Sequence, residues 1–506
     1  IMRVVVWLSL LLALTDLGAS EEPPRNVLLI IVDNLRPALG AYGDKIVQTP
    51  NIDSWSANAS VFSRAFCQIA WCAPSRNSFL TGRLPDQTQA YNFIDSFREI
   101  GRNWTTLPGY FKNHGYHTTS VGKVFHPNLP ANYDYPMSWS EPPINWDKPS
   151  CPMGDMSCEL NPSDLDVDSA ATHEATEQLR SATTTSRPFF LAVGYQAPRL
   201  PWVYPPKSAT GYPPAELWPT PKYPTSPPDD TPDWFRPTEV NLYTDIRNVT
   251  HQHPMPRSLQ QRVRRGYYAT ITHIDTQIGL VLGALDRFGL SRSTIVAVIA
   301  DHGQTLGEQN MWSMMSNMET SLRVPFLLHS PFLPFTPRRF ISDPIELVDL
   351  FPTLVSLAHL PPPPAAWDLA GRDVSCLMEV SPVCSWNAHA TSATVVPVAR
   401  SQITRCHNCT AAYVGISTEC TWDEVSDRHY MVPCCKANRT SFDLMGYSVR
   451  SAEWRYTTWC PWTGGGADWG KCRRSELFAP FLIRLLLALH ALPLTTHPTK
   501  NDHNVP

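Results

Sequence analysis

Residues 26–34 read Asn-Val-Leu-Leu-Ile-Ile-Val-Asp-Asn, an apolar run that ends in two polar residues. An apolar run without alternation is typical of a strand buried on both faces of a mostly parallel sheet. The pattern recurs at 188–195 and at 294–300, and the last run is followed by Asp301-His302-Gly303. The chain of 506 residues is long enough for one large α/β domain and a smaller unit.

Two of these runs are followed directly by an aspartate. In open α/β sheets, functional groups gather at the carboxyl ends of the strands, so we expect Asp33, Asn34 and Asp301 to lie at that edge. Carboxylate oxygens, supported by an amide carbonyl, suit a hard divalent cation. The alternative is that these residues only cap the elements that follow, which is common for Asp and Asn.

A second informative segment, residues 70–82, reads Ala-Trp-Cys-Ala-Pro-Ser-Arg-Asn-Ser-Phe-Leu-Thr-Gly. Its core from Cys72 to Arg76 resembles the signature of the type I sulfatases, and Phe79-Leu80-Thr81-Gly82 fits the long form of that signature. In this family the cysteine is oxidised after synthesis to formylglycine, which serves as the nucleophile. Read without the family, Cys72 could equally be a buried small side chain or half of a disulfide.

The resemblance implies roles in catalysis for several residues. A hydrated aldehyde at Cys72 would offer one hydroxyl to attack sulfur and a second to expel the product. Arg76 would hold the nucleophile or a sulfate oxygen, and Ser75 would bind substrate. Residues 115–126 (Gly-Tyr-His-Thr-Thr-Ser-Val-Gly-Lys-Val-Phe-His) are similar to a second sulfatase signature, in which Lys123 would contact a sulfate oxygen and His126 would relay a proton.

A metal site is also implied by the resemblance, which extends to Thr49-Pro50-Asn51-Ile52-Asp53. Asp33, Asn34, Asp301 and His302 would hold one calcium ion. Imidazole is a poorer partner for calcium than oxygen is, so His302 is included through the resemblance alone.

Segments similar to sulfatases follow one another in a fixed order from Asn26 to Phe478. The family implies an alkaline-phosphatase-like α/β fold: a mostly parallel sheet between helices, with a smaller carboxyl-terminal antiparallel subdomain. Within the family, residues 122–127, 189–195 and 444–450 look like the sulfatases that act in lysosomes on 2-sulfated iduronate of heparan and dermatan sulfate. The implied partners are a sulfated glycosaminoglycan or another sulfate ester and, during maturation, the formylglycine-generating enzyme.

Four residues depart from the family pattern at the expected site. Asn34 stands where the family has a second metal-binding Asp, and Gln196 stands where it has a His. Gln304 replaces a Trp of the iduronate-specific sulfatases, and Met314 replaces an expected Lys. We assign Gln196, Gln304 and Met314 to substrate binding, and we expect weaker electrostatic support for the metal and the sulfate.

The chain has the features of a protein of the secretory route. Residues 2–20 contain one positive charge, an apolar run and small residues at the end, which is typical of a cleaved signal and too short for a membrane span. Thirteen cysteines fit an oxidising compartment, and a net charge of −4 gives no indication of a nucleic-acid partner. We expect a lysosomal protein, with secretion as the alternative. Sequons that agree with this route are at Asn58, Asn103, Asn248, Asn408 and Asn438.

We divide the chain into a signal peptide at 1–20, a catalytic domain at 21–390 and a smaller subdomain at 391–506. Helical periodicity over 259–290 predicts a long packing helix in the catalytic domain. Residues 324–328 and 346–354 look like a strand and a helix of the family. In the subdomain, 445–450 and 454–459 read as two antiparallel strands.

The run 479–490 departs from the family and is too short to span a bilayer, so we interpret it as an unusual tail or a gene-model error. We interpret the initial Ile1 as a sign that the true start is missing.

The cysteines of the subdomain allow two interpretations. Cys406-His407-Asn408-Cys409 looks like half of a zinc site, and Cys434-Cys435 could supply the other ligands. In a secreted chain we favour disulfides. Nearer the amino terminus, Cys151 and Cys158 are expected to close a small loop.

Three functions are compatible with these residues. The first is a sulfatase of glycosaminoglycans; the second is a sulfatase-like protein that binds sulfated glycans without efficient turnover. The third is another hydrolase of the alkaline-phosphatase-like group, such as a phosphodiesterase, which normally uses Ser or Thr with two zinc ions. Cys72 within a complete formylglycine signature argues against the third.

Overall fold

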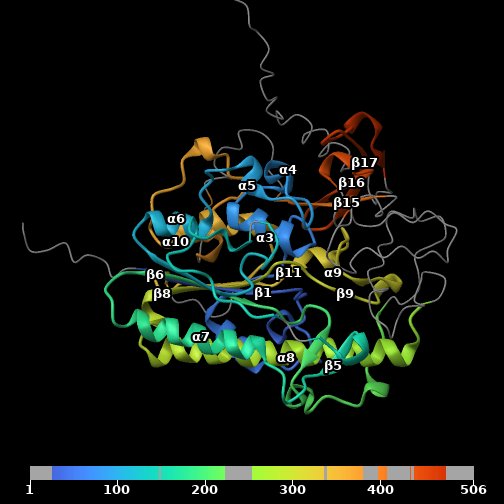
Figure 1. Cartoon of the computed structure of the whole chain (residues 1–506), viewed down its shortest axis with the longest axis horizontal. Helices are drawn as coiled ribbons and strands as arrows, with labels where there is room; N and C mark the ends of the chain where they lie inside the picture. The colour runs from blue at the N-terminus through green and yellow to red at the C-terminus, as the bar shows by residue number, and fades with distance from the viewer. Residues whose placement is uncertain are drawn as a thin grey trace, which may run out of the picture.

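The computed structural model describes residues 25–130, 132–147, 150–222, 254–334, 339–379, 384, 397–406, 434 and 438–474. The expected signal peptide, the sequons at Asn248 and Asn408 and the atypical 479–490 run lie outside these residues. Helices cover both faces of a seven-stranded sheet, and a second sheet lies beside it (Figure 1). The predicted α/β architecture with a separate antiparallel sheet is therefore confirmed.

The central sheet has the strand order β13-β2-β12-β8-β1-β6-β4. Strands β8, β1, β6 and β4 are parallel neighbours, whereas β12 is antiparallel to both β8 and β2. The sheet is thus mixed, with a parallel half that matches the prediction. The bounds are β1 (Asn26–Val32), β2 (Ser60–Phe62), β4 (His117–Gly122), β6 (Phe189–Tyr195), β8 (Thr294–Ala300), β12 (Phe326–His329) and β13 (Arg339–Ile341).

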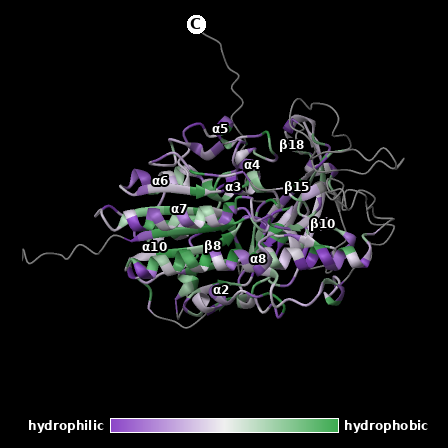
Figure 2. Cartoon of the chain, turned by 60° about the horizontal axis from the view of Figure 1, so that its bottom comes forward, coloured by the Kyte–Doolittle hydropathy of each residue, from purple (hydrophilic) through white to green (hydrophobic). Residues whose placement is uncertain are grey.

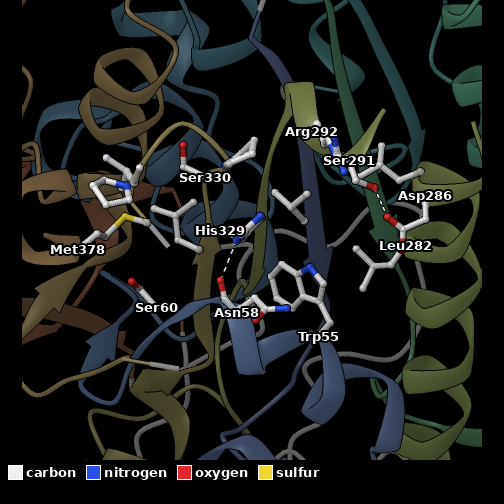
Figure 3. Close-up of a pocket in the computed structure, with 16 residues that line it drawn as sticks. Trp55, Asn58, Ser60, Leu282, Asp286, Ser291, Arg292, His329, Ser330 and Met378 are labelled. Carbon is white, nitrogen blue, oxygen red and sulfur yellow. Dashed lines mark hydrogen bonds between the residues drawn. The ribbon is translucent and has the colours of Figure 1, made fainter. Parts of the chain in front are cut away.

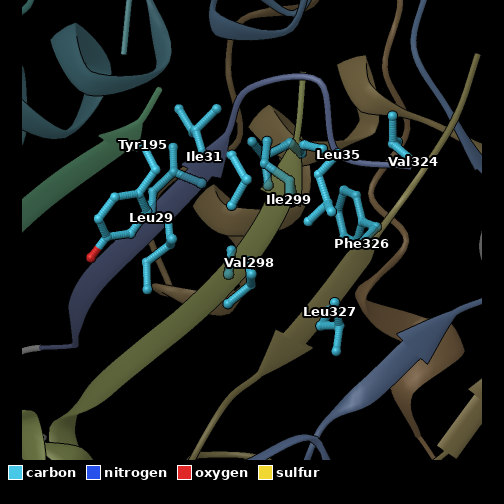
Figure 4. Packing of buried hydrophobic residues seen from close by; sticks show 14 of the residues in the cluster. Leu29, Ile31, Leu35, Tyr195, Val298, Ile299, Val324, Phe326 and Leu327 are labelled. Carbon is cyan, nitrogen blue, oxygen red and sulfur yellow. The ribbon is translucent and has the colours of Figure 1, made fainter. Parts of the chain in front are cut away.

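Burial on both faces explains why the central strands lack alternation. Every residue of β1, β6 and β8 is buried, and the side chains pack into one continuous core (Figure 4). Each fully buried aliphatic side chain contributes roughly 1.5–3 kcal/mol relative to an exposed one. The three predicted strands are confirmed almost residue for residue. The predicted strand at 324–328 is divided at Pro325, which has no N–H for a ladder, into β11 (Arg323–Val324) and β12.

Two layers of helices cover the sheet (Figure 1). One face carries α3 (Cys72–Thr81), α6 (Leu107–Asn113) and α10 (Leu350–Leu357), and the other carries α7 (Val167–Ala182) and α8 (Arg257–Arg287). Figure 2 shows hydrophobic residues concentrated on the strands between these layers. The predicted long helix corresponds to α8, and the helix predicted from 346 begins only at Leu350. Shorter helices are α2 (Pro50–Trp55), α4 (Pro85–Thr88), α5 (Phe97–Ile100) and α9 (Glu319–Leu322).

The second sheet is antiparallel, as predicted, and it is attached to the segment that precedes α3. In its strand β15, the Gln402 N–H donates to the Gln68 carbonyl over 2.7 Å. The Ser401 hydroxyl donates to the Cys67 carbonyl over 2.6 Å. The small sheet therefore supports the start of α3. Its strands are β15 (Ala399–Arg405), β16 (Leu444–Arg450), β17 (Arg455–Thr463), β18 (Gly466–Ala467) and β19 (Arg473–Arg474).

Four disulfides lie in the described part of the chain: Cys151–Cys158, Cys376–Cys384, Cys406–Cys434 and Cys460–Cys472. The predicted 151–158 loop is confirmed. The pairing of Cys406 with Cys434 favours disulfides over zinc, although Cys409 and Cys435 lie outside the described residues. Within the described ranges, no helix is both long and apolar enough to cross a membrane.

Candidate active site

Asp33 and Asp301 lie side by side because their strands are parallel neighbours. Val32 of β1 is in register with Ala300 of β8, and the Asp301 N–H donates to the Val32 carbonyl over 3.3 Å. Both carboxyl groups are fully buried. The geometric expectation drawn from the strand ends is therefore met, and the two acids lie together in the candidate site.

Lys123 reaches Asp33 because two glycines let β4 and β6 approach closely. A Cβ on Gly194 would lie 2.0 Å from the Lys123 carbonyl oxygen, and Gly122 has a φ of 72°. Lys123 Nζ then lies 2.5 Å from Asp33 Oδ2. Burial alone raises the pKa of Asp33, but Lys123 and Arg76 outweigh it and hold that pKa well below its usual range, so Asp33 is a carboxylate.

Cys72 is the first residue of α3, a helix whose residues are all buried. Its Sγ lies 3.2 Å from His302 Nε2 and 3.8 Å from Asn34 Oδ1. Burial, with a further contribution from Asp33, raises the pKa of the Cys72 thiol. The unmodified side chain is therefore a protonated thiol, which is a poor nucleophile.

Arg76 and Ser75 connect α3 to the two acids. Arg76 Nε donates to Asp301 Oδ2 over 2.9 Å and Nη2 donates to Asp33 Oδ1 over 3.3 Å, while Nη1 donates to the carbonyls of Lys123 and Val124. The Ser75 hydroxyl donates to the Asp301 carbonyl over 2.6 Å. These contacts hold the framework of the site, a role different from the direct substrate contacts expected from the sequence.

Both histidines use Nδ1 to donate to a backbone carbonyl. His302 Nδ1 donates to the Gly303 carbonyl over 3.0 Å, so Nε2 is left as an acceptor facing Cys72. His126 Nδ1 donates to the Pro127 carbonyl over 2.9 Å, and within the described residues its buried Nε2 has no protein partner. Burial, with Lys123 next, holds the pKa of His126 well below its usual range.

Three of the four departures from the family pattern contact one another. Asn34 Nδ2 donates to Gln304 Oε1 over 2.9 Å and lies 3.5 Å from Met314 Sδ. Asn34 itself has a φ of 63°, a left-handed conformation that Asn tolerates better than most residues. Met314 also belongs to the apolar cluster that contains Cys72. The sequence alone gave no indication that these residues touch.

Gln196, the fourth departure, is turned toward a different part of the fold. Its Nε2 donates to the Trp146 carbonyl over 2.6 Å, and its backbone N–H donates to Asp168 Oδ1 over 2.7 Å. Within the described part of the chain, no hydrogen bond connects Gln196 to Cys72 or to the two acids. The structure therefore brings together the other predicted residues but not this side chain.

Arg199 is a further candidate for the site, and no sequence motif indicates it. Its charge acts on Asp33, on Cys72 and on His126, and its side chain is partly exposed, whereas Lys123 and Arg76 are fully buried. The signal was present in the chain, because Arg199 follows the carboxyl end of β6, the strand next to β1.

The donor set fits a divalent cation. One ligand atom from each of Asp33, Cys72, Asp301 and His302 lies within 4.8 Å of the others, and Asn34 adds an amide oxygen on the Cys72 side. Carboxylate and amide oxygens suit calcium or magnesium, and imidazole and thiol suit softer metals. The arrangement thus supports a metal site without specifying the ion.

Comparisons with known proteins indicate one family. A family model described as Sulfatase matches residues 25–360. Mouse iduronate 2-sulfatase is 39% identical over 397 residues, covering 69% of this chain and 71% of the mouse protein. Human iduronate 2-sulfatase is 35% identical over 527 aligned residues, covering 90% of each chain.

Solved structures share the fold at low sequence identity. A 2-O GAG sulfatase is 19% identical with a TM-score of 0.61 and covers 92% of this chain and 90% of its own. The phosphonate monoester hydrolase of Silicibacter pomeroyi is 18% identical with a TM-score of 0.63, covering 92% of this chain and 94% of its own. At these identities the likeness concerns the architecture alone.

Proposed function

The chain belongs to the sulfatase family, and from that premise we propose that it removes the 2-sulfate of iduronate in heparan or dermatan sulfate. It is an enzyme that hydrolyses sulfate esters and is similar to iduronate 2-sulfatase. The observation that carries the proposal is the buried cluster around Cys72, in which two acids, two cations and His302 surround the first residue of α3.

We propose that Cys72 is converted to formylglycine by the formylglycine-generating enzyme. The hydrated aldehyde supplies one hydroxyl for attack on sulfur and a second for release of sulfate. The protonated thiol of the encoded residue does not offer this chemistry, because its pKa is raised by burial and by Asp33. The contact between residue 72 and His302 supports the proposal, since it would place an acceptor beside the attacking group.

Proton transfer is assigned to the two histidines. His302 Nε2, 3.2 Å from Cys72 Sγ, would accept the proton of the attacking hydroxyl. His126 would accept the proton of the second hydroxyl of the aldehyde hydrate, because its buried Nε2 has no protein partner among the described residues and its low pKa keeps it neutral. The proton-accepting role of His302 would replace the ligand role expected from the sequence, because Nδ1 is used by the Gly303 carbonyl and Nε2 has a single lone pair.

Calcium is the metal we propose, held by Asp33, Asn34 and Asp301 with His302 beside them. When bound, the ion supplies positive charge opposite the sulfate oxygens. Arg76 and Lys123 keep Asp33 ionised, as its low pKa indicates. Arg76 also holds in place Asp301, whose pKa is raised by burial. Asn34 contributes no charge, so we expect weaker calcium binding than in relatives with a second Asp.

Substrate binding is assigned to the partly exposed side of the site. Arg199 offers a guanidinium to the carboxylate or sulfate of the sugar, which compensates in part for Met314 at the expected Lys position. Gln304 and Met314 give fewer charged and aromatic contacts than a Trp and a Lys. We therefore propose that turnover of 2-sulfated iduronate is slow.

The cellular location is also part of the proposal. Four disulfides support passage through an oxidising compartment, and the expected signal peptide and the resemblance to iduronate-specific sulfatases favour the lysosome over secretion.

Mass spectrometry of the tryptic peptide that contains Cys72, from protein made in cells with the modifying enzyme, tests the nucleophile. An intact thiol would contradict catalysis by formylglycine. The wild type and Met314→Lys are then assayed on a sulfated iduronate disaccharide and on a small aryl sulfate. We expect low wild-type turnover of the disaccharide that rises in Met314→Lys. Activity on neither substrate with formylglycine present would favour the glycan-binding alternative.

A further inference from the structure

A cavity of about 660 Å³ is lined by residues of the carboxyl-terminal part of α8 and of strands β2, β8 and β12, and Figure 3 shows its lining residues. Val296, in its wall, precedes Asp301 by five residues of extended chain, which is roughly 16 Å. The cavity is therefore separate from the candidate active site, and its volume is within the roughly 300–1,000 Å³ typical of small-ligand pockets.

The side chain of Asn58, the acceptor of the sequon Asn58-Ala59-Ser60, lines this cavity. Asn58 is exposed, so its side-chain nitrogen is accessible at the rim. Its backbone carbonyl accepts a hydrogen bond of 2.7 Å from His329 Nδ1, which fixes the loop to β12. Figure 3 shows the Asn58 side chain beside the ring of Trp55. A group attached to Asn58 would thus start its path along an indole face.

The lining of the cavity suits a sugar. Trp55 is partly exposed and offers an aromatic surface, and its ring meets that of His329 edge to face at 6.5 Å. Ser330 is only 6% exposed, and its hydroxyl has no hydrogen-bond partner among the described residues. A buried hydroxyl without a partner is uncommon and indicates a missing polar group. The oxygen is shielded as the side chain stands, and a rotation of Ser330 would let a hydroxyl or acetamido group of a sugar become that partner.

We propose that Asn58 carries an N-linked glycan whose first sugars occupy this cavity, against Trp55 and Ser330. The bond forms between Asn58 Nδ2 and C1 of the first N-acetylglucosamine of an oligosaccharide linked to a lipid diphosphate. Nδ2 loses one proton, and the bond between C1 and the lipid diphosphate breaks, which releases that diphosphate. The proposal is independent of the sulfatase activity, because the cavity lies away from Cys72.

The test uses the full chain made in eukaryotic cells that glycosylate secreted proteins. Intact glycopeptides are first identified by mass spectrometry. An amidase that releases N-glycans and leaves Asp in place of Asn is then applied to native and to denatured protein. We expect release of the glycan at Asn58 to be about tenfold slower in the native protein than in the denatured protein, because the cavity would protect the linkage. Asn103 is an internal control, because it is also an exposed sequon residue but does not line this cavity.

Variants separate the sugar contacts from a general loss of structure. Asn58→Gln should remove the glycopeptide, whereas Ser60→Thr preserves the sequon and should retain it. Trp55→Ala should accelerate native release at Asn58 and leave Asn103 unchanged, and Trp55→Phe should preserve most of the protection. An unoccupied Asn58, or native release as fast as denatured release in the wild type, would overturn the proposal.

Discussion

Replacing Lys123 by Met removes the charge that the structure places closest to Asp33. Lys123 Nζ lies 2.5 Å from Asp33 Oδ2, and both side chains are buried. At an effective dielectric constant of about 20, the gross attraction between these two charges is roughly 7 kcal/mol. Breaking one partner of a buried pair typically lowers the free energy of unfolding by roughly 3–5 kcal/mol, because the other charge stays buried.

We expect Lys123→Met to lower the free energy of unfolding by about 3 kcal/mol. This is the lower end of that range, because Arg76 Nη2 remains 3.3 Å from Asp33 Oδ1. The free energy of unfolding is measured by urea denaturation with and without calcium. If Asp33 is a ligand, saturating calcium should stabilise the variant more than the wild type, since a bound ion at about 100 times its Kd contributes about 2.7 kcal/mol. Turnover of a sulfate ester should fall by roughly 10²–10³.

Lys207→Met is the matched control, because Lys207 is exposed. Its free energy of unfolding should stay within about 0.5 kcal/mol of that of the wild type. The reasoning is refuted if Lys123→Met is as stable as this control. If the variant is destabilised but calcium does not raise its free energy of unfolding, Asp33 is not a metal ligand. The low pKa of Asp33 would then be explained by its ion pair with Lys123.

Further expectations follow from the same contacts. Asn34→Asp should tighten calcium binding measured by titration calorimetry, and an unchanged affinity would mean that Asn34 is not a ligand. Arg199→Ala should raise KM for a sulfated iduronate disaccharide by about tenfold or more with a smaller change in KM for an aryl sulfate, and equal changes would contradict a contact with the sugar. Burial, opposed by Arg372, raises the pKa of Asp349 to about 6. Between about pH 4 and pH 6 the folded chain keeps this proton and the unfolded chain has released it, so stability falls as pH rises through that window. Asp349→Asn should reduce the loss of stability between pH 5 and pH 7 by roughly 1 kcal/mol in urea denaturation, and an unchanged pH dependence would assign the loss to other groups.

Much of the candidate site was predictable because it depends on strand ends. Unalternating apolar runs identified β1, β6 and β8, and the rule for open α/β sheets placed Asp33 and Asp301 at one edge. The family signatures then indicated Cys72 and Lys123. Where the chain follows such local rules, sequence and structure agree to within a few residues.

What the sequence did not provide is the direction of individual side chains. Arg76 was expected to meet the nucleophile or a sulfate oxygen, yet its donors are used by Asp33, Asp301 and two carbonyls. Gln196 was expected at the substrate and is held by the Trp146 carbonyl. Hydrogen bonds between residues distant in the chain decide these directions, and spacing or periodicity contains no information about them.

The departures from the family pattern are best understood as one set. Asn34 Nδ2 is 2.9 Å from Gln304 Oε1 and 3.5 Å from Met314 Sδ, so a neutral amide here faces a neutral amide and a thioether. In the family pattern an Asp and a Lys occupy the positions of Asn34 and Met314, so two opposite charges are absent from this contact here. A lysine introduced alone at 314 would face the N–H donors of the Asn34 amide. That contact is less favourable for an ammonium group than a contact with a carboxylate. The effects of substitutions at two residues in direct contact are not additive. The effect of Met314→Lys therefore depends on the residue at position 34. The substitutions at positions 34 and 314 are therefore expected to be coupled in their effects, whereas the buried acids are paired with Arg76 and Lys123.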